Sequence, residues 1–202
     1  MTYPVQLDVT SPPRFDRIQL ALRLVIAIAL GWVGATAGWL WCLLFFALPV
    51  IASVAISTRD PKYYVDEVGP TLWRALGWLL AFSAYMLLLT DRFPTGESAD
   101  VHIEIQLDGH PTTGSALLRL ILSIPSGAVL AILGIASSVL VVVSAVMILV
   151  ERQIPAGIFA FQRGVLRWQA RLLAYHASLV DEYPPFSFDD THARPDNRAS
   201  TL

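Results

Sequence analysis

Two long runs without a charged side chain dominate the pattern of hydrophobic and polar positions along the chain. The first covers residues 24–58 and the second covers residues 120–150. An apolar run of about 18 residues or more is typical of a helix that crosses a membrane, because roughly 20 helical residues span the hydrocarbon core of a bilayer. The pattern therefore predicts an integral membrane protein.

The second apolar run contains a position at which one helix should end and another begin. Pro125 lacks an amide donor and disfavours helix in the residue before it. We expect a lead-in helix over 115–124, lying at the membrane interface, and a membrane-spanning helix over 128–150 with a length of about 34 Å. The first run should divide in the same way, although residues 34–38 offer a hairpin turn as an alternative.

The order of the rarer residues indicates that one pattern occurs twice in the chain. Leu22-Arg23-Leu24 recurs as Leu118-Arg119-Leu120, and a third helix is expected after each apolar run. The two third helices end in related motifs, marked by Asp91 and Pro94 in the first copy and by Asp181, Tyr183 and Pro184 in the second. We interpret the chain as a tandem duplication, with a first membrane repeat at 1–95, a second at 96–186 and a disordered polar tail at 187–202.

Short segments of alternating apolar and polar residues precede the helices of both repeats. Residues 101–107 alternate along their whole length, and residues 5–9 show the same pattern more weakly. A period of two is typical of a strand with one exposed face. We therefore expect a short extended lead at the start of each repeat.

Together these elements predict an all-α integral membrane protein with about four transmembrane helices, interfacial helices and the two short extended leads. Two spans in each repeat would return the chain to the side on which it began. The N-terminus, the linker between the repeats and the C-terminal tail would then all face the cytoplasm. The alternative is three spans in each repeat, which gives an inverted repeat with its two equivalent faces on opposite sides of the membrane.

Small residues recur at helical spacing in both apolar runs and predict close packing of helices. A stripe of Gly and Ala lets two helix backbones approach closely, and the simplest partner for each stripe is the stripe of the other repeat. The residues concerned are Gly31, Ala35 and Gly38 in the first repeat and Gly127, Ala131 and Gly134 in the second.

A stripe of arginines distinguishes the last predicted helix from its counterpart in the first repeat. Arg163, Arg167 and Arg171 are four residues apart, so they fall within about 80° on one helix face. The aligned positions of the first repeat hold a tryptophan, a glycine and an alanine. We interpret the stripe as a contact with anionic lipid headgroups or with an acidic partner. A solvated face of an interfacial helix is the alternative.

The composition excludes several classes of function. A net charge of −2 gives no general attraction to nucleic acid. Cys42 is the single cysteine, so neither an internal disulfide nor a thiolate metal cluster is expected. The four histidines lack the spacing of a zinc site, and the chain carries no nucleophile motif. We therefore predict no enzyme activity, no cofactor and no metal.

Three motifs in the second half carry a family resemblance. They are Gly164-Val165-Leu166-Arg167-Trp168, Ala174-Tyr175 and Asp181-Glu182-Tyr183-Pro184-Pro185-Phe186. With these motifs the second half resembles the bacterial membrane family called "domain of unknown function 4389". The first half resembles a more divergent copy, in which Thr95 replaces the second proline. The resemblance implies a multi-pass protein of the bacterial inner (cytoplasmic) membrane, and it implies no particular chemistry.

The sequence thus predicts a non-enzymatic accessory or scaffold protein of the inner membrane. Its expected partners are membrane lipid, a partner membrane protein or a second copy of the chain. The alternative is a small transporter or channel module built from the two repeated halves. A transporter should carry polar or charged residues in the middle of its spans, whereas the two long apolar runs carry none beyond Ser, Thr and Cys.

Overall fold

The computed structural model describes residues 3–32, 37–95, 100–107 and 109–188 of the chain. Within these residues the fold is mostly helical. Its elements are, in order, β1 (Val5–Val9), α1 (Arg17–Trp32), α2 (Ala37–Thr58), α3 (Pro61–Tyr63), the π-helical turn η1 (Tyr64–Val68), α4 (Gly69–Met86), β2 (Val101–Ile105), α5 (Thr113–Leu122), α6 (Ile124–Glu151) and α7 (Ala156–His176).

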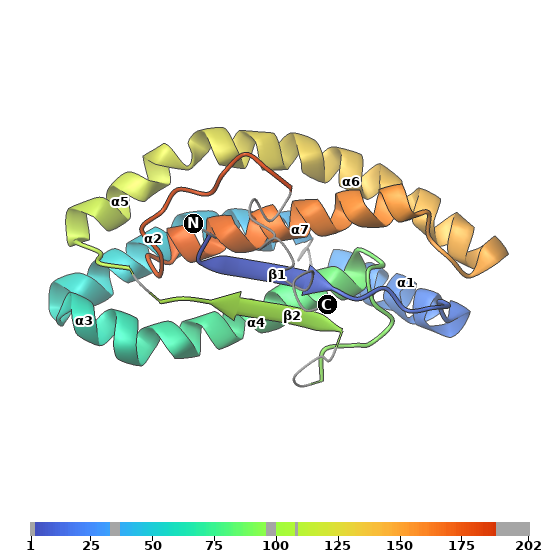
Figure 1. The fold of residues 1–202 in the computed structure, drawn as a ribbon, viewed down its shortest axis with the longest axis horizontal. Coiled ribbons are helices and arrows are strands. Elements are labelled where there is room, and N and C mark those ends of the chain that lie inside the picture. Colours follow the sequence, from blue (N-terminus) through green and yellow to red (C-terminus); the bar gives the residue numbers. More distant parts are fainter. Residues whose placement is uncertain (1–2, 33–36, 96–99, 108, 189–202) are drawn as a thin grey trace, which may run out of the picture.

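The elements lie side by side along the long axis of the molecule (Figure 1). α6 arches over α7, α7 lies against β1, β1 pairs with β2, and β2 lies beside α4. α2 packs against both α5 and α7. The main core lies between the sheet, α2, α4 and α7, and its most completely buried side chains include Leu7, Tyr64, Leu80, Leu166 and Leu179.

The two extended leads form an antiparallel sheet of two strands. Leu7 of β1 lies opposite Ile103 of β2. The apolar residues of β1 are buried and the two polar residues between them are exposed, which is the expected period of two. The prediction of strand-like leads is confirmed for residues 5–9 and 101–105, so the fold is mostly but not purely α-helical.

The break predicted at Pro125 separates α5 from α6. α5 begins with a capping box, in which Thr112 and Ser115 each bind the other's backbone amide, and it ends at Leu122. α6 begins at Ile124 and carries Pro125 in its first turn, where a missing amide costs no helical hydrogen bond. The prediction is confirmed, although the short helix begins and ends two residues earlier than expected and the long helix begins four residues earlier.

The first half of the chain does not divide at the position that the proposed repeat aligns with Pro125. α1 continues through Ala29, the residue that the repeat aligns with Pro125, because alanine keeps its amide and favours helix. The expectation of a short lead-in helix in this repeat is therefore wrong, since α1 ends only at Trp32. Residues 33–36, which hold part of the alternative hairpin turn, lie outside the described residues.

Among the residues that the structure describes, only α6 is both long enough and apolar enough to cross a membrane. The apolar stretch Cys42–Thr58 of α2 and the whole of α5 are shorter. The described residues thus contain one candidate membrane span, and the four-span arrangement is not confirmed.

Candidate functional site

The arginine stripe of α7 faces β1 and the C-terminal segment of the same chain. Arg167 is buried, with Nε donating to the Leu7 carbonyl at 2.9 Å and Nη1 donating to the Phe188 carbonyl at 2.9 Å. The ladder bonds at the two ends of the sheet involve Pro4 and Thr10, so the Leu7 carbonyl points away from β2. Arg167 therefore supplies a donor that the free edge of β1 would otherwise lack.

The other two arginines of the stripe also bind groups of the same chain. Arg171 is 1% exposed, donates from Nη1 to the Ser187 carbonyl at 3.1 Å, and stacks on the ring of Tyr3. Arg163 is half-buried, and its Nη1 lies 3.0 Å from the carboxylate of Asp8. The stripe that sequence analysis assigned to lipid or a partner thus meets β1 and residues 187–188, and only Arg163 keeps substantial contact with solvent.

Replacing Arg167 by glutamine should destabilise the protein more than replacing Arg163 by glutamine. A hydrogen bond to a charged group contributes about 1.5–3 kcal/mol, and Arg167 makes two of them to carbonyls. A solvent-exposed ion pair such as that between Arg163 and Asp8 contributes about 0–1 kcal/mol. Thermal unfolding in mild detergent, followed by tryptophan fluorescence, measures the difference. Equal melting temperatures for the two variants would contradict the assignment.

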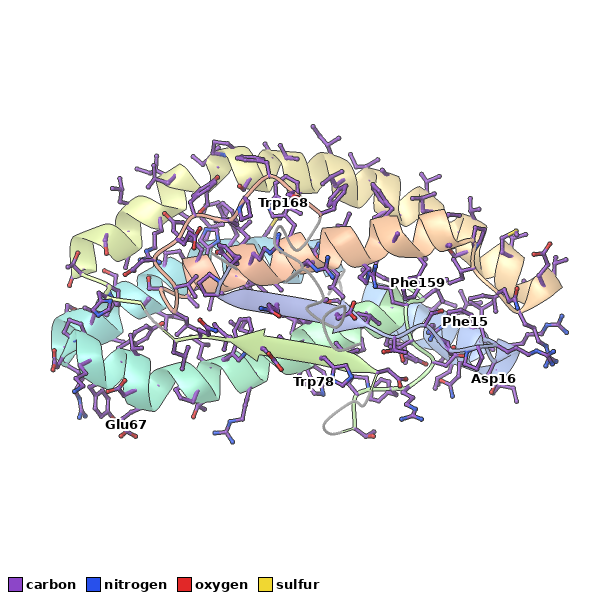
Figure 2. The ribbon with its side chains drawn as sticks, in the orientation of Figure 1. Phe15, Asp16, Glu67, Trp78, Phe159 and Trp168 are labelled. Atoms are coloured by element: carbon purple, nitrogen blue, oxygen red, sulfur yellow. The ribbon has the colours of Figure 1, made fainter. Side chains whose placement is uncertain are left out.

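The motif residues of α7 hold the C-terminal segment in place. A Cβ added to Gly164 would lie 2.8 Å from Cβ of Phe188, so only glycine lets this segment approach the helix so closely. One turn later, the Trp168 ring meets the rings of Phe186 and Phe188 edge-on, at centroid distances of 5.3 and 6.1 Å. Figure 2 shows Trp168 between α7 and this segment. The spacing of Gly164 and Trp168 thus has a packing explanation.

A buried arginine in α5 binds the end of α7. Arg119 is 5% exposed and donates to the carbonyls of Val180 and Tyr175 and to the carboxylate of Asp181. Its guanidinium lies 4.7 Å from the centre of the Tyr175 ring. We call these residues the second arginine centre. It joins the lead-in helix of the second repeat to the turn that follows its third helix.

The first half of the chain contains a similar group of contacts, which we call the first arginine centre. Arg23 of α1 is 4% exposed, donates to the Thr90 carbonyl and to the Asp91 carboxylate, and lies 4.3 Å from the centre of the Tyr85 ring. Each residue of this centre aligns with a residue of the second centre in the proposed repeat. The turns that follow the two third helices also match, because Leu88 and Ser178 both have a positive φ, of 63° and 56°.

In the described part of the chain, the residues of the repeat-end motifs are buried or form hydrogen bonds within the protein. Asp91 accepts a hydrogen bond from the Asp16 amide at 2.7 Å. Burial raises the pKa of its carboxyl group above the ordinary range, while that hydrogen bond and Arg23 act in the opposite direction. Pro94 and Pro184 are both buried. Tyr183 meets Ser126 of α6, with 2.6 Å between the two hydroxyl oxygens.

α6 presents three of its four serines to the protein, while Ser138 and many apolar residues lie on the outside. Ser126, Ser137 and Ser144 are at most 4% exposed. Ser137 donates to the side-chain oxygen of Gln162 in α7, and Gln162 Nε2 donates to the Ser137 carbonyl at 2.9 Å. The opposite face leaves 60–70% of each of five β-branched side chains exposed, namely Ile132, Ile135, Val139, Val142 and Val150. This polarity is the reverse of a helix on the surface of a soluble domain.

The burial of these three serines on one face of α6 was not predicted from the sequence. The signal was present, because Ser137 and Ser144 are seven residues apart and therefore share one side of a helix. The Gly and Ala stripe, to which helix packing was assigned, lies elsewhere on α6. A Cβ on Gly127 would lie 3.0 Å from the Phe45 ring, but Ala131 is exposed and Gly134 has no atom within 4 Å of such a Cβ.

The corresponding stripe of the first repeat cannot be compared in the same way. The surroundings of Gly31, Ala35 and Gly38 lie outside the part of the chain whose side chains are described. Gly127 therefore has a packing contact with α2, while the expected meeting of the two stripes stays a prediction.

In the described residues we looked for a metal site and for a cavity that could hold a ligand. They hold no group of three His, Cys, Asp or Glu side chains that could bind a metal ion. A cavity of about 30 Å³, roughly the volume of one water molecule, is lined by Phe45, Leu130, Gln169, Leu172, Leu173 and His176. The absence of enzyme activity, cofactor and metal stays a prediction.

Comparison with known proteins identifies one segment. Residues 114–187 match the model of a family described as a domain of unknown function (DUF4389). The matched segment begins in α5 and ends beside α7, so it contains the second arginine centre, α6 and the motif residues of α7. No curated protein and no solved structure matches the chain. The match supports the family resemblance for a single copy, the one that lies in the second half.

Proposed function

We propose that this chain is a non-enzymatic accessory or scaffold protein of the bacterial inner membrane that binds lipid through the outer side of its helices. The inverted polarity of α6 carries the proposal. A helix that buries serines and exposes Ile and Val is stable where the surrounding medium is itself apolar. In water, an exposed apolar area of this kind marks an interaction surface.

The exposed apolar side chains continue from α6 onto three other helices. We call them the apolar surface. It comprises Ile18, Leu24, Val25 and Ile28 of α1, Leu43, Phe46, Ile51 and Val54 of α2, Leu118 and Ile121 of α5, and the five residues of α6 given above. Each of these side chains is more than half exposed. An apolar surface spread over four helices supports lipid as the principal partner.

Exposed cations flank the apolar surface and support contact with anionic headgroups. Arg14, Arg17 and Arg152 are all exposed where α1 begins and α6 ends. Arg17 donates to the Val150 carbonyl at 3.3 Å, which places its guanidinium beside the last apolar turn of α6. A basic residue at the surface of an anionic membrane contributes about 1 kcal/mol of attraction. These arginines suit the anionic-lipid role better than the buried arginines of α7.

The tandem duplication forms part of the same proposal. Arg23 and Arg119 occupy equivalent positions of the two proposed copies, and β1 and β2, the extended leads of these copies, pair antiparallel with each other. Antiparallel pairing of equivalent strands is consistent with an approximate two-fold axis between two copies. The two arginine centres, with their equivalent partners, also support the duplication.

Placing carboxylates on the apolar surface should release the protein from membranes. The double variant Ile135→Glu, Val142→Glu adds two charges to side chains that are 70% and 65% exposed. Each charge in the hydrocarbon region costs about 2.5–3.5 kcal/mol on insertion scales. Two such charges together cost about 5–7 kcal/mol, which corresponds to a shift of more than about a thousandfold in partition, so we expect most of the variant to leave the membrane fraction after cell fractionation.

The matched control adds a carboxylate to the sheet instead. Gln6→Glu changes an exposed residue of β1 that lies opposite the exposed Glu104 of β2 and outside the apolar surface, so membrane recovery should stay unchanged. The proposal would be wrong if the double variant were recovered with membranes as fully as the unmodified protein. It would also be wrong if the unmodified protein were recovered in the soluble fraction.

A further inference from the structure

The middle of α6 lies level with charged residues of the sheet. α6 comprises residues 124–151, and Ser137 is at its midpoint. The Ser137 carbonyl accepts a hydrogen bond from Gln162 of α7. The next residue of α7, Arg163, forms the ion pair with Asp8 of β1. The Arg163 side chain is half-buried, at 34% exposure, and the Asp8 side chain is exposed to 59%.

α6 keeps contact with the rest of the protein along its length, so it cannot be tilted away from the sheet without losing these contacts. Near its start, Ser126 meets Tyr183. Near its end, Ile148 is fully buried in a small cluster with Phe15 and Leu88. Figure 1 shows α6, α7 and both strands extending along the same long axis.

The sheet presents polar side chains outward along both strands. Gln6 and Asp8 of β1 are exposed, as are His102 and Glu104 of β2. Within the described part of the chain β1 and β2 form a two-stranded sheet, so each strand has one edge without a strand partner among these residues. Open sheet edges and charged side chains do not face lipid within the hydrocarbon region, because their polar groups find no partner there.

An α6 perpendicular to the membrane would therefore bring the polar face of the sheet to the depth of the bilayer centre. An α6 parallel to the membrane avoids this, because α7 then separates the sheet from the lipid by the thickness of one helix. The geometry points to an in-plane arrangement: the apolar surface lies in one leaflet of the bilayer, α6 lies along the membrane plane, and the sheet faces water. This inference rests on the proposed binding to lipid.

The positively charged residues at the two ends of the molecule support a single lipid leaflet as the partner that covers the apolar surface. Arg17 and Arg152 are exposed at one end, and Arg59 and Lys62 are exposed at the end where α2 turns into α3. In Figure 2, Asp16 and Glu67 mark these opposite ends. Cations at both ends of one apolar surface can reach the phosphates of the same leaflet, since Lys and Arg side chains extend to headgroup level.

Single-cysteine labelling tests the arrangement on the full-length chain. Cys42→Ser removes the native thiol, and Gln6→Cys, Lys62→Cys and Gln153→Cys each add one thiol at an exposed position. These positions report on the sheet, on the turn after α2 and on the turn after α6. A membrane-impermeant maleimide is applied to spheroplasts and to inside-out vesicles. We expect all three positions to be labelled from the same side.

Opposite labelling of Gln153→Cys and Gln6→Cys would overturn the inference, because α6 would then cross the bilayer. Opposite labelling of Lys62→Cys and Gln6→Cys would overturn it for α2. Both outcomes leave the protein in the membrane fraction, so they are distinct from failure of the proposed function, in which the protein is soluble. Efficient disulfide cross-linking of Val139→Cys into a dimer would also overturn it, since a second copy would then cover the apolar surface.

Discussion

Replacement of Arg119 by methionine is expected to lower the free energy of unfolding by about 3 kcal/mol or more. Methionine fills much of the same volume but donates no hydrogen bond. The Val180 carbonyl would lose its buried donor, and Asp181 would lose the guanidinium that neutralises it. The contact with the Tyr175 ring would also be lost. Thermal unfolding in mild detergent, or the yield of monodisperse protein if the variant does not fold, measures the effect.

Arg74→Met is the matched control for this prediction. Arg74 lies exposed on α4, and among the described residues its side chain binds Pro70 and Thr71 of its own helix. Its replacement should change the free energy of unfolding by no more than about 0.5 kcal/mol. Arg23→Met should behave like Arg119→Met, because the first arginine centre has equivalent partners. If Arg119→Met were as mild as Arg74→Met, the second arginine centre would have no structural importance.

Replacement of Gly109 by alanine is expected to destabilise the protein by about 1–3 kcal/mol. A Cβ at this position would lie 2.7 Å from the Ser178 carbonyl oxygen and 2.9 Å from the carbonyl group of Leu179. Both obstacles are backbone atoms of the turn after α7, where Ser178 already has a positive φ. The Gly109 amide also donates to the Leu179 carbonyl at 3.1 Å, and this bond would break if the turn moved.

Gly114→Ala provides the comparison with the same chemical change. Gly114 lies in the first turn of α5, and a Cβ there would meet no atom within 4 Å. Alanine favours helix over glycine by about 1 kcal/mol, so stability should stay the same or rise slightly. Chemical unfolding of the two variants should therefore give changes of opposite sign or very different size. Equal destabilisation by both substitutions would contradict the close approach at Gly109.

Predictions that depended on local physics were the most accurate. Pro125 ends one helix and begins the next through its own missing amide, so the break between α5 and α6 required no knowledge of the rest of the fold. The alternating residues of 101–105 form a strand as their period indicates. The same local argument explains the error in α1, because the aligned position holds alanine and nothing there interrupts the helix.

The sequence did not show which groups the polar side chains contact. Helical spacing showed that Arg163, Arg167 and Arg171 share one face of a helix. It did not show what that face contacts, because a cationic face can meet lipid headgroups, water or other parts of the protein. The partner of Arg167 is the carbonyl of Leu7, 160 residues away, and only the tertiary structure brings the two together. The serine face of α6 was hidden for a similar reason, because apolar residues surround the serines and make the helix look uniformly apolar.

The apolar helix, the strands and the helix break could be predicted from the sequence, because these features follow from periodicity and from residues that are neighbours in the chain. The tertiary structure alone decided that the arginines of α7 bind β1, that Arg119 and Arg23 are buried, and that α6 turns its serines inward. These outcomes depend on which distant backbone carbonyl or side chain fills a given position. Periodicity shows which residues share a face, whereas packing decides what that face meets.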